Sequence, residues 1–388
     1  MQRARLVLIL FAASPIAFAV QDCELNGEYV NPANGHTTAG RTGVMKCRDR
    51  DTGELARERE LRAGKFVGLE RFYNRDGKLE REHRINERGN RDGLAREFFP
   101  DGRVAREETY RNGRTFGIGR NWHPNGALKR IVVRGDDGRE IAEAEFNDRG
   151  QLQDLRCADR PVMGLYVDDK ALCGHGARKP VVSELYSDKG EVRGRVAHLA
   201  GQMTLSESLW DNGKLRDQRE IGEGNQVERR FSREGVKRHE TRWATTGQSR
   251  TKELEQEFHE SGNLVRERHW QAGELASEKT WYLNGRMKAD YRYARRDGRR
   301  SVCDVSEFHD NGEMAGTGTY LMSYGYPDRP VGTVRGFDRD GRLRKEVEYD
   351  PKGRLKRERE LDEKGVVLRD DAVFEDGSRK AFAAEAPR

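Results

Sequence analysis

The chain has 388 residues, of which 36% are charged and only 34% hydrophobic, and its formal net charge is +6. So few apolar side chains cannot fill the cores of the two or three globular domains that this length would otherwise allow. The 73 basic residues are interleaved with 67 acidic ones. Because nucleic-acid-binding surfaces need clusters of a single sign, this balance argues against nucleic acid as a partner.

Residues 1–19 have the pattern of a cleavable signal peptide. Two arginines precede the apolar run Leu6–Ala13, and an A-x-A site ends at Ala19. The apolar run is too short for a stable membrane anchor. We therefore expect cleavage near Ala19 and an exported protein, periplasmic or secreted, without stable membrane insertion.

Residues 20–52 are interpreted as an N-terminal cap. They lack the glycine spacing of the rest of the chain and contain Cys23 and Cys47. Terminal units of repeat arrays are usually atypical. In an oxidising compartment we expect a disulfide between these two cysteines, which would contribute about 3 kcal/mol by closing a short loop.

From residue 53 onward, glycine recurs about every twelve residues. Near the C-terminus the spacing is 12 throughout the series Gly341, Gly353, Gly365 and Gly377. Repetition at a fixed short period is typical of an array in which one small unit is stacked many times. Such arrays present long surfaces, so the chain is predicted first to be a binding protein.

Each unit has a ring four residues before the glycine and an aliphatic residue two after it, as Tyr73 and Leu79 stand around Gly77. The residue before the glycine is usually Asn or Asp, which is a strong hairpin signal. A three-residue loop ending in a left-handed glycine would let Tyr73 face Leu79, whereas a two-residue loop would not. Because an aromatic–aliphatic cross-strand pair contributes about 0.2–1 kcal/mol, we expect the bulged three-residue turn.

The expected fold is all-β, an elongated array of antiparallel β-hairpin repeats with about 12 residues per strand–turn unit and 22–25 per hairpin. Whether the sheet stays open or closes into a solenoid is left open. The expected segments after the cap are repeats at 53–152, an interruption at 153–184, repeats at 185–312, an interruption at 313–336, repeats at 337–377 and a disordered tail at 378–388.

The first interruption contains Cys157 and Cys173, which we expect to form a second short-loop disulfide. Cys303 is the fifth cysteine and has no assigned partner. It is expected to be buried and inert, with pairing to another chain as the alternative.

No catalytic, cofactor-binding or metal-binding constellation is predicted, and no cofactor is expected. His123, His259 and His309 recur at one repeat position, which repetition explains without a metal. Trp210 and Trp270 stand three residues before Gly213 and Gly273, so we expect them on the face opposite the repeat's rings. Exposed rings there are candidates for binding a protein partner or a glycan.

The better units resemble the bacterial variant of the MORN repeat, among them FYNRDGKLERE (72–82) and FFPDGRVAREE (98–108). Several proteins of that family are antitoxin components, so the resemblance implies binding and neutralising a protein toxin. The expected function is therefore that of a non-catalytic, exported protein-binding scaffold, including an antitoxin- or immunity-like role, with a toxin or envelope component as partner. The alternative is a cell-wall or glycan-binding repeat protein of the envelope.

Overall fold

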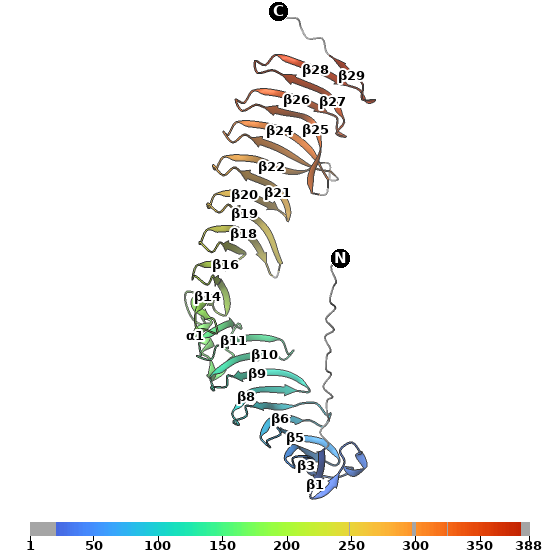
Figure 1. Cartoon of the computed structure of the whole chain (residues 1–388), viewed down its shortest axis with the longest axis vertical. Helices are drawn as coiled ribbons and strands as arrows, with labels where there is room; N and C mark the ends of the chain where they lie inside the picture. The colour runs from blue at the N-terminus through green and yellow to red at the C-terminus, as the bar shows by residue number, and fades with distance from the viewer. Residues whose placement is uncertain (1–20, 248, 297–299, 324, 382–388) are drawn as a thin grey trace, which may run out of the picture. The chain divides into compact units, whose positions relative to one another are not determined.

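The computed structural model describes residues 21–247, 249–296, 300–323 and 325–381. These residues form one antiparallel sheet of 12 strands and a second of 17, and in each the strands lie side by side almost entirely in chain order (Figure 1). The expected all-β array of hairpins is therefore confirmed. The expected signal peptide, 1–19, lies outside the described residues.

The first sheet belongs to a compact unit whose described residues are 21–177, Leu185–Glu191 and Ala200–Gln202. Its strands are β1 (Gln21–Leu25), β2 (Glu28–Val30), β3 (Gly43–Asp49), β4 (Leu55–Arg62), β5 (Lys65–Tyr73), β6 (Leu79–Ile85), β7 (Gly93–Phe98), β8 (Val104–Arg111), β9 (Arg114–Trp122), β10 (Leu128–Arg134), β11 (Glu140–Phe146) and β12 (Leu152–Arg156).

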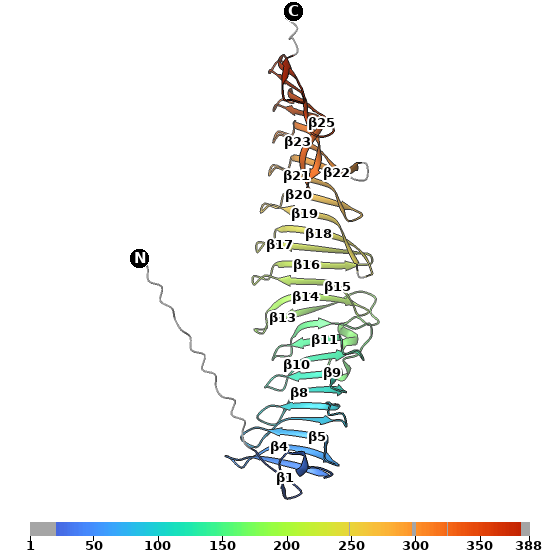
Figure 2. The ribbon, with the colours of Figure 1, turned by 90° about the vertical axis from the view of Figure 1, so that its right-hand side faces the viewer.

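The second unit holds the remaining residues and most of the second sheet, whose hairpins follow one another in Figure 2. Its strands are β13 (Val181–Tyr186), β14 (Val192–Leu199), β15 (Gln202–Leu209), β16 (Leu215–Gly222), β17 (Asn225–Phe231), β18 (Lys237–Thr246), β19 (Ser249–Phe258), β20 (Leu264–Gln271), β21 (Glu274–Trp281), β22 (Met287–Arg296), β23 (Arg300–Phe308), β24 (Met314–Ser323), β25 (Tyr326–Phe337), β26 (Leu343–Tyr349), β27 (Leu355–Leu361), β28 (Val367–Val373) and β29 (Arg379–Ala381).

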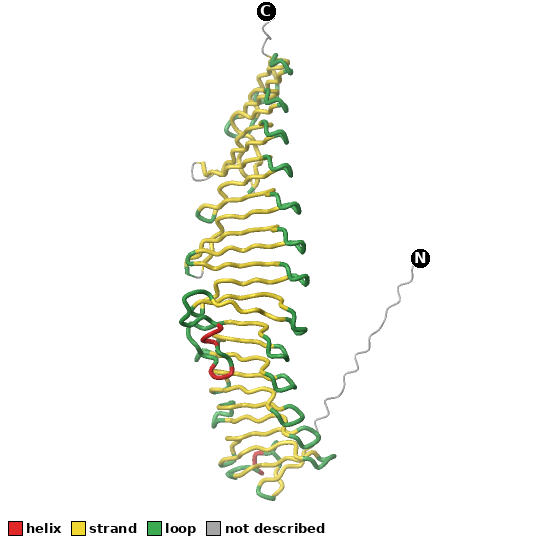
Figure 3. Tube along the Cα trace, turned by 90° about the vertical axis from the view of Figure 1, so that its left-hand side faces the viewer, coloured by secondary structure: helices red, strands yellow, loops and turns green. Residues whose placement is uncertain are grey.

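Successive turns alternate between the two ends of the strands, which we call end A and end B (Figure 3). End A carries the bulged turn that the sequence predicts. Tyr73 faces Leu79, the amide of Gly77 donates to the carbonyl oxygen of Asn74 at 3.0 Å, and Gly77 has φ 71°. Only glycine adopts this positive φ without steric cost, and this explains why glycine recurs here.

At end B, some glycines stand in a different turn from the bulged turn of end A. Ala63 and Gly64 have φ 48° and 82°, and Arg62 pairs with Lys65 across them. This is a two-residue type I′ turn, in which both central residues have positive φ. The prediction of a bulged turn throughout is therefore wrong for these hairpins, since the same residue–glycine dipeptides fit both loop lengths.

Neighbouring end A turns are joined by asparagine side chains. The asparagine just before the glycine donates its Nδ2 to a backbone carbonyl of the next end A turn. The four bonds are Asn125 to Asp148 at 2.6 Å, Asn212 to Arg233 at 2.7 Å, Asn284 to Asp310 at 2.8 Å and Asn311 to Arg339 at 2.6 Å. The Asn-Gly pairs thus form the turns and also link neighbouring hairpins through hydrogen bonds.

Neither sheet closes on itself in the described part of the chain, so the alternative of an open array holds there. The interruption of the repeat at 313–336 does not interrupt the sheet, because these residues form most of the long hairpin β24–β25. Of the tail expected to be disordered from 378, Arg379–Ala381 instead pair with β28 as β29, and 382–388 lie outside the described residues.

The segment after β12 contains three short features: η2 (Gly164–Tyr166), α1 (Asp169–Leu172) and the second disulfide; the cap contains η1 (Gly35–Thr37). The guanidinium of Arg120 on β9 lies 4.3 Å from the ring centroid of Tyr166. This segment therefore packs against β9. No helix in the described residues is long and apolar enough to cross a membrane.

Candidate partner-binding groove

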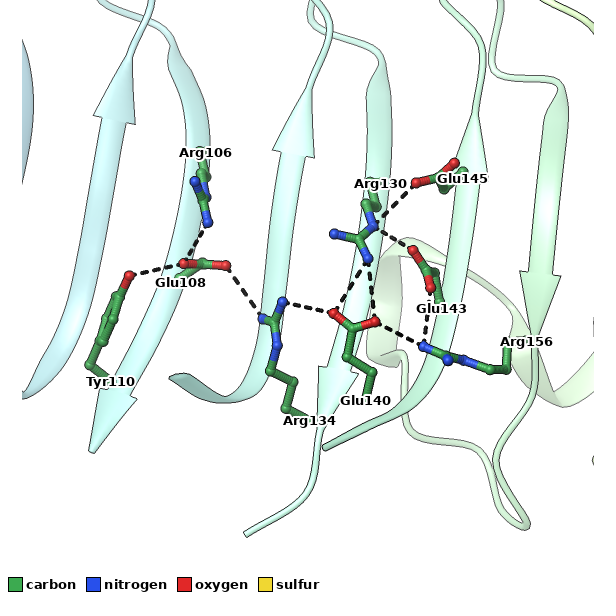
Figure 4. Close-up of polar contacts among 9 residues, drawn as sticks. All are labelled: Arg106, Glu108, Tyr110, Arg130, Arg134, Glu140, Glu143, Glu145 and Arg156. Carbon is green, nitrogen blue, oxygen red and sulfur yellow. Dashed lines mark hydrogen bonds and ion pairs between the residues drawn. The ribbon is translucent and has the colours of Figure 1, made fainter. Parts of the chain in front are cut away.

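Most charged side chains on the sheets are bound to one another. Figure 4 shows such a network across β8–β12 of the first sheet, where Arg134 lies 3.4 Å from Glu108 and 3.0 Å from Glu140. Burial opposes ionisation of Glu140, but the hydrogen bond from Arg156 and the charges of Arg130 and Arg134 hold its pKa below the ordinary value. These charges join neighbouring strands and leave few groups free for a ligand.

Glutamates are buried within such networks in both units, among them Glu70 in the first and Glu240 in the second. Glu70 contacts Arg57, Arg59 at 2.6 Å and His83 at 3.1 Å. Burial alone would raise the pKa of Glu70, but its hydrogen bonds to His83 and Arg57 and the charges of Arg59 and Arg57 lower it to about 2. Glu240 has the same arrangement, and its pKa is also lowered to about 2. Buried carboxylates with this many partners serve the fold.

The second sheet has a hollow of about 1000 Å³ over β19–β25, which we call the aromatic groove. Seven rings line it: Trp270, Trp281, Tyr282, Tyr291, Tyr293, Phe308 and Tyr326. Charged side chains of both signs stand between the rings, among them Arg268 and Glu278, which are 2.9 Å apart. The volume is that of a binding cleft, and the lining combines the seven rings with six charged side chains.

Strand register brings Arg268, Glu278 and Tyr291 to one face. Glu278 pairs with Arg268 on one side and with Tyr291 on the other, and Tyr291 pairs in turn with Val305. Tyr293 shares the face because side chains alternate along a strand. Burial raises the pKa of both tyrosines, so their hydroxyls stay protonated and can donate or accept hydrogen bonds.

The two tryptophans singled out from the sequence are not equivalent. Trp270 is in β20 and lines the aromatic groove, with the ammonium of Lys252 4.8 Å from its ring centroid. Trp210 lies outside the strands, in an end A turn, and its indole N–H donates to the carbonyl oxygen of Phe231 at 3.2 Å. The two tryptophans do not occupy the same position of the repeat, because Gly213 closes an end A turn and Gly273 an end B turn.

The structure joins the cysteines in the expected pairs. Cys23 is bonded to Cys47 and Cys157 to Cys173, with S–S distances of 2.06 and 1.98 Å. Two disulfides fit an oxidising environment. Cys303 is a free, buried thiol on β23, and burial raises its pKa to about 11.

The histidines of the repeat have separate structural partners. His123 Nε2 donates to the carbonyl oxygen of Phe146 at 2.9 Å, and His309 Nε2 donates to that of Phe337 at 3.0 Å. His259 contacts the hydroxyl of Ser261 at 3.0 Å. Across the residues that the structure describes, no cluster of three histidine, cysteine or carboxylate side chains is arranged to hold a metal.

Sequence reasoning found Trp270 but missed most of the groove. The signal that could have found more is the alternation in Tyr291-Arg292-Tyr293, which places two rings on the same face of a strand. No local signal indicates that Glu278 and Glu307 would flank these rings, because they come from the neighbouring strands.

Residues 91–112, which span the hairpin β7–β8, match the family model described as MORN repeat variant. No curated protein matches the chain in sequence. Among solved structures, the chain is similar to a complex of TcdB2–TccC3 with Cdc42, at 10% identity and a TM-score of 0.17, covering 94% of this chain and 20% of that one. It is also similar to TcdB2–TccC3 without the hypervariable C-terminal region, at 10% identity and a TM-score of 0.15, covering 88% and 22%. The chain thus spans about a fifth of the length of these matched chains. TM-scores this low do not support any conclusion about its fold or function.

Proposed function

We propose that this protein is a non-catalytic, exported scaffold that binds a protein partner through the aromatic groove. The observation that carries the proposal is the gathering of seven aromatic rings, with interleaved arginines, around one hollow over β19–β25. Aromatic and arginine side chains are the residues most enriched at the energetic centres of protein interfaces. Elsewhere on the described strands the charged side chains largely bind one another, which supports the aromatic groove as the binding surface.

Export is the second part of the proposal. The cleavage expected near Ala19 and the two disulfides together suit a periplasmic or secreted protein. The MORN-variant match at 91–112 supports a repeat scaffold. More specifically, we propose an antitoxin- or immunity-like role, with a toxin or another envelope component as the partner.

The test is an affinity capture from envelope and secreted extracts with wild type and with a Trp270→Ala, Tyr291→Ala double variant. The matched control is Phe374→Ala, which removes a ring that is 52% exposed and stands outside the groove. We expect wild type and the control to retain one stoichiometric protein that the double variant loses. Equal capture by all three proteins would refute the groove as the interface.

A glycan ligand is the second candidate, because tyrosine and tryptophan rings also stack on sugars. It predicts that wild type is retained on peptidoglycan and that Trp270→Ala is not. Retention on peptidoglycan by wild type, with no captured protein, would replace the protein partner with a glycan.

A further inference from the structure

The repeat places a glutamate five residues before an end A glycine in five hairpins, and one of the five differs from the others. The shared position puts each carboxylate beside the neighbouring strands at the same level of the sheet. The five are Glu97, Glu145, Glu257, Glu307 and Glu360.

Four of these glutamates have a basic side chain directly across a strand pair. The ion pairs are Glu97 with Arg106 at 4.0 Å, Glu145 with Arg130 at 3.3 Å, Glu257 with Arg266 at 3.4 Å and Glu360 with Lys345 at 3.5 Å. The repeat therefore supplies its own counter-charge at this position.

Glu307 has small neighbours instead. It pairs with Ala289 on β22 and with Gly316 on β24. Among the side chains that the structure describes, none forms an ion pair or hydrogen bond with its carboxylate. The basic residues Lys345 and Arg335, on β26 and β25, are already bound, since Lys345 lies 2.7 Å from Glu358 and Arg335 lies 2.8 Å from Glu346.

Because Ala289 and Gly316 are small, they leave space beside the carboxylate of Glu307. A second hollow of about 280 Å³, over β23–β26, shares Glu307 with the aromatic groove. A Cβ at Gly316 would stand 3.7 Å from Glu307 Oε2, so the carboxylate leans over this glycine. The hollow is lined by Gly316, Gly318 and the ring of Tyr320, with Tyr291 on the groove side.

Two rings flank the same carboxylate. Burial, and next the charge of Glu307, raises the pKa of Tyr291 and of Tyr320. Aromatic faces attract cations, and an ionised carboxylate strengthens hydrogen bonds to a cationic donor. A carboxylate between two rings, with open space in front of it, therefore has the chemistry to receive a cation.

We propose that Glu307, Tyr291 and Tyr320 form a subsite for one cationic side chain, arginine or lysine, of the protein partner. The inference rests on the proposed function and adds the chemistry of the contacting residue. The partner supplies the counter-charge that the repeat supplies to itself in the other four hairpins.

The test uses the full chain and three blocked tripeptides, acetyl-Gly-Xaa-Gly-amide, in which Xaa is arginine, lysine or the neutral arginine analogue citrulline. Binding is read by saturation-transfer NMR on the peptides. The variants are Glu307→Gln and, as the matched control, Glu360→Gln, which changes the same repeat position where Lys345 already neutralises the charge. Because Glu307 is exposed and has no partner among the described side chains, its substitution should leave the melting curve unchanged.

We expect saturable binding of the arginine or lysine peptide and none of the citrulline peptide. Glu307→Gln should weaken that binding by about tenfold or more, since a hydrogen bond to a charged group is worth about 1.5–3 kcal/mol. Glu360→Gln should leave it unchanged. Three results would each overturn the subsite. They are binding that is unchanged by Glu307→Gln, binding of the citrulline peptide equal to that of the arginine peptide, and no saturable binding of either cationic peptide.

The subsite and the proposed function fail in different ways. If Trp270→Ala with Tyr291→Ala abolishes capture of the partner while Glu307→Gln leaves it intact, the groove stands and the cation subsite is wrong. If the groove variants leave capture intact, the proposed function itself is wrong.

Discussion

Glu240 on β18 provides the sharpest test of how charges hold this fold together. Its side chain is 3% exposed, and it lies 2.9 Å from Lys237, 2.9 Å from Arg242 and 3.2 Å from Arg229. Glu240→Gln would leave three cations around a group that carries no charge. Breaking a buried ion pair by removing one partner costs about 3–5 kcal/mol.

The pKa of Glu240 gives an independent magnitude. Burial opposes ionisation, but Lys237, Arg242 and Arg229 lower the pKa from 4.5 to about 2. A carboxyl group with these two values in the folded and unfolded chain contributes about 3 kcal/mol. Because the folded pKa is depressed, this stability is present above pH 4.5 and is lost as the pH falls toward 2.

Amide hydrogen exchange over β17–β19 measures the effect, because a repeat array can open locally without unfolding as a whole. We expect Glu240→Gln to lower the local free energy of opening by about 3 kcal/mol at pH 7. The control is Glu257→Gln on the adjacent strand, whose side chain is 37% exposed and whose ion pair should contribute at most about 1 kcal/mol. A loss below about 1 kcal/mol for Glu240→Gln, or an equal loss for the control, would refute the reasoning.

Three further predictions concern turns and cross-links. Gly353→Val should destabilise its hairpin by more than about 1 kcal/mol, because φ is +81° and an added Cβ would lie 3.1 Å from that of Arg329; an unchanged melting curve would contradict this. Asn311→Ala should cost about 1 kcal/mol through the lost bond to Arg339, seen as faster exchange in that turn, and unchanged exchange would argue against the stacking role of asparagine. Replacing Cys157 and Cys173 with serine should cost about 3 kcal/mol, and full protection of 157–173 under the same conditions would be inconsistent with a stabilising link.

The sequence predicts the hairpin array well because its signals are local. Tyr73, Gly77 and Leu79 fall within one turn, so spacing alone selects the bulged loop at end A. The two-residue turns at end B were missed because Asn112-Gly113 has the same dipeptide chemistry as an end A turn. The length of each loop depends on how many residues of the two flanking strands pair with each other. The dipeptide at the turn does not reveal that number.

The candidate site was harder to predict because it is assembled across strands. Trp270 stood out by residue type, whereas Tyr291 and Glu307 gain their roles only from each other and from the small residues beside them. Trp210 and Trp270 look equivalent in the sequence because both stand three residues before a glycine. The two glycines close turns at opposite ends of the strands, so the tryptophans do not share a position.

The most direct test of the central claim is a hydrogen-exchange footprint of the captured complex. The account predicts slowed exchange in β20–β25 when the partner is bound, with β3–β12 of the first sheet exchanging as in the free protein. Slowed exchange confined to the first sheet, or no difference between free and bound protein, would contradict a scaffold that binds its partner through the aromatic groove.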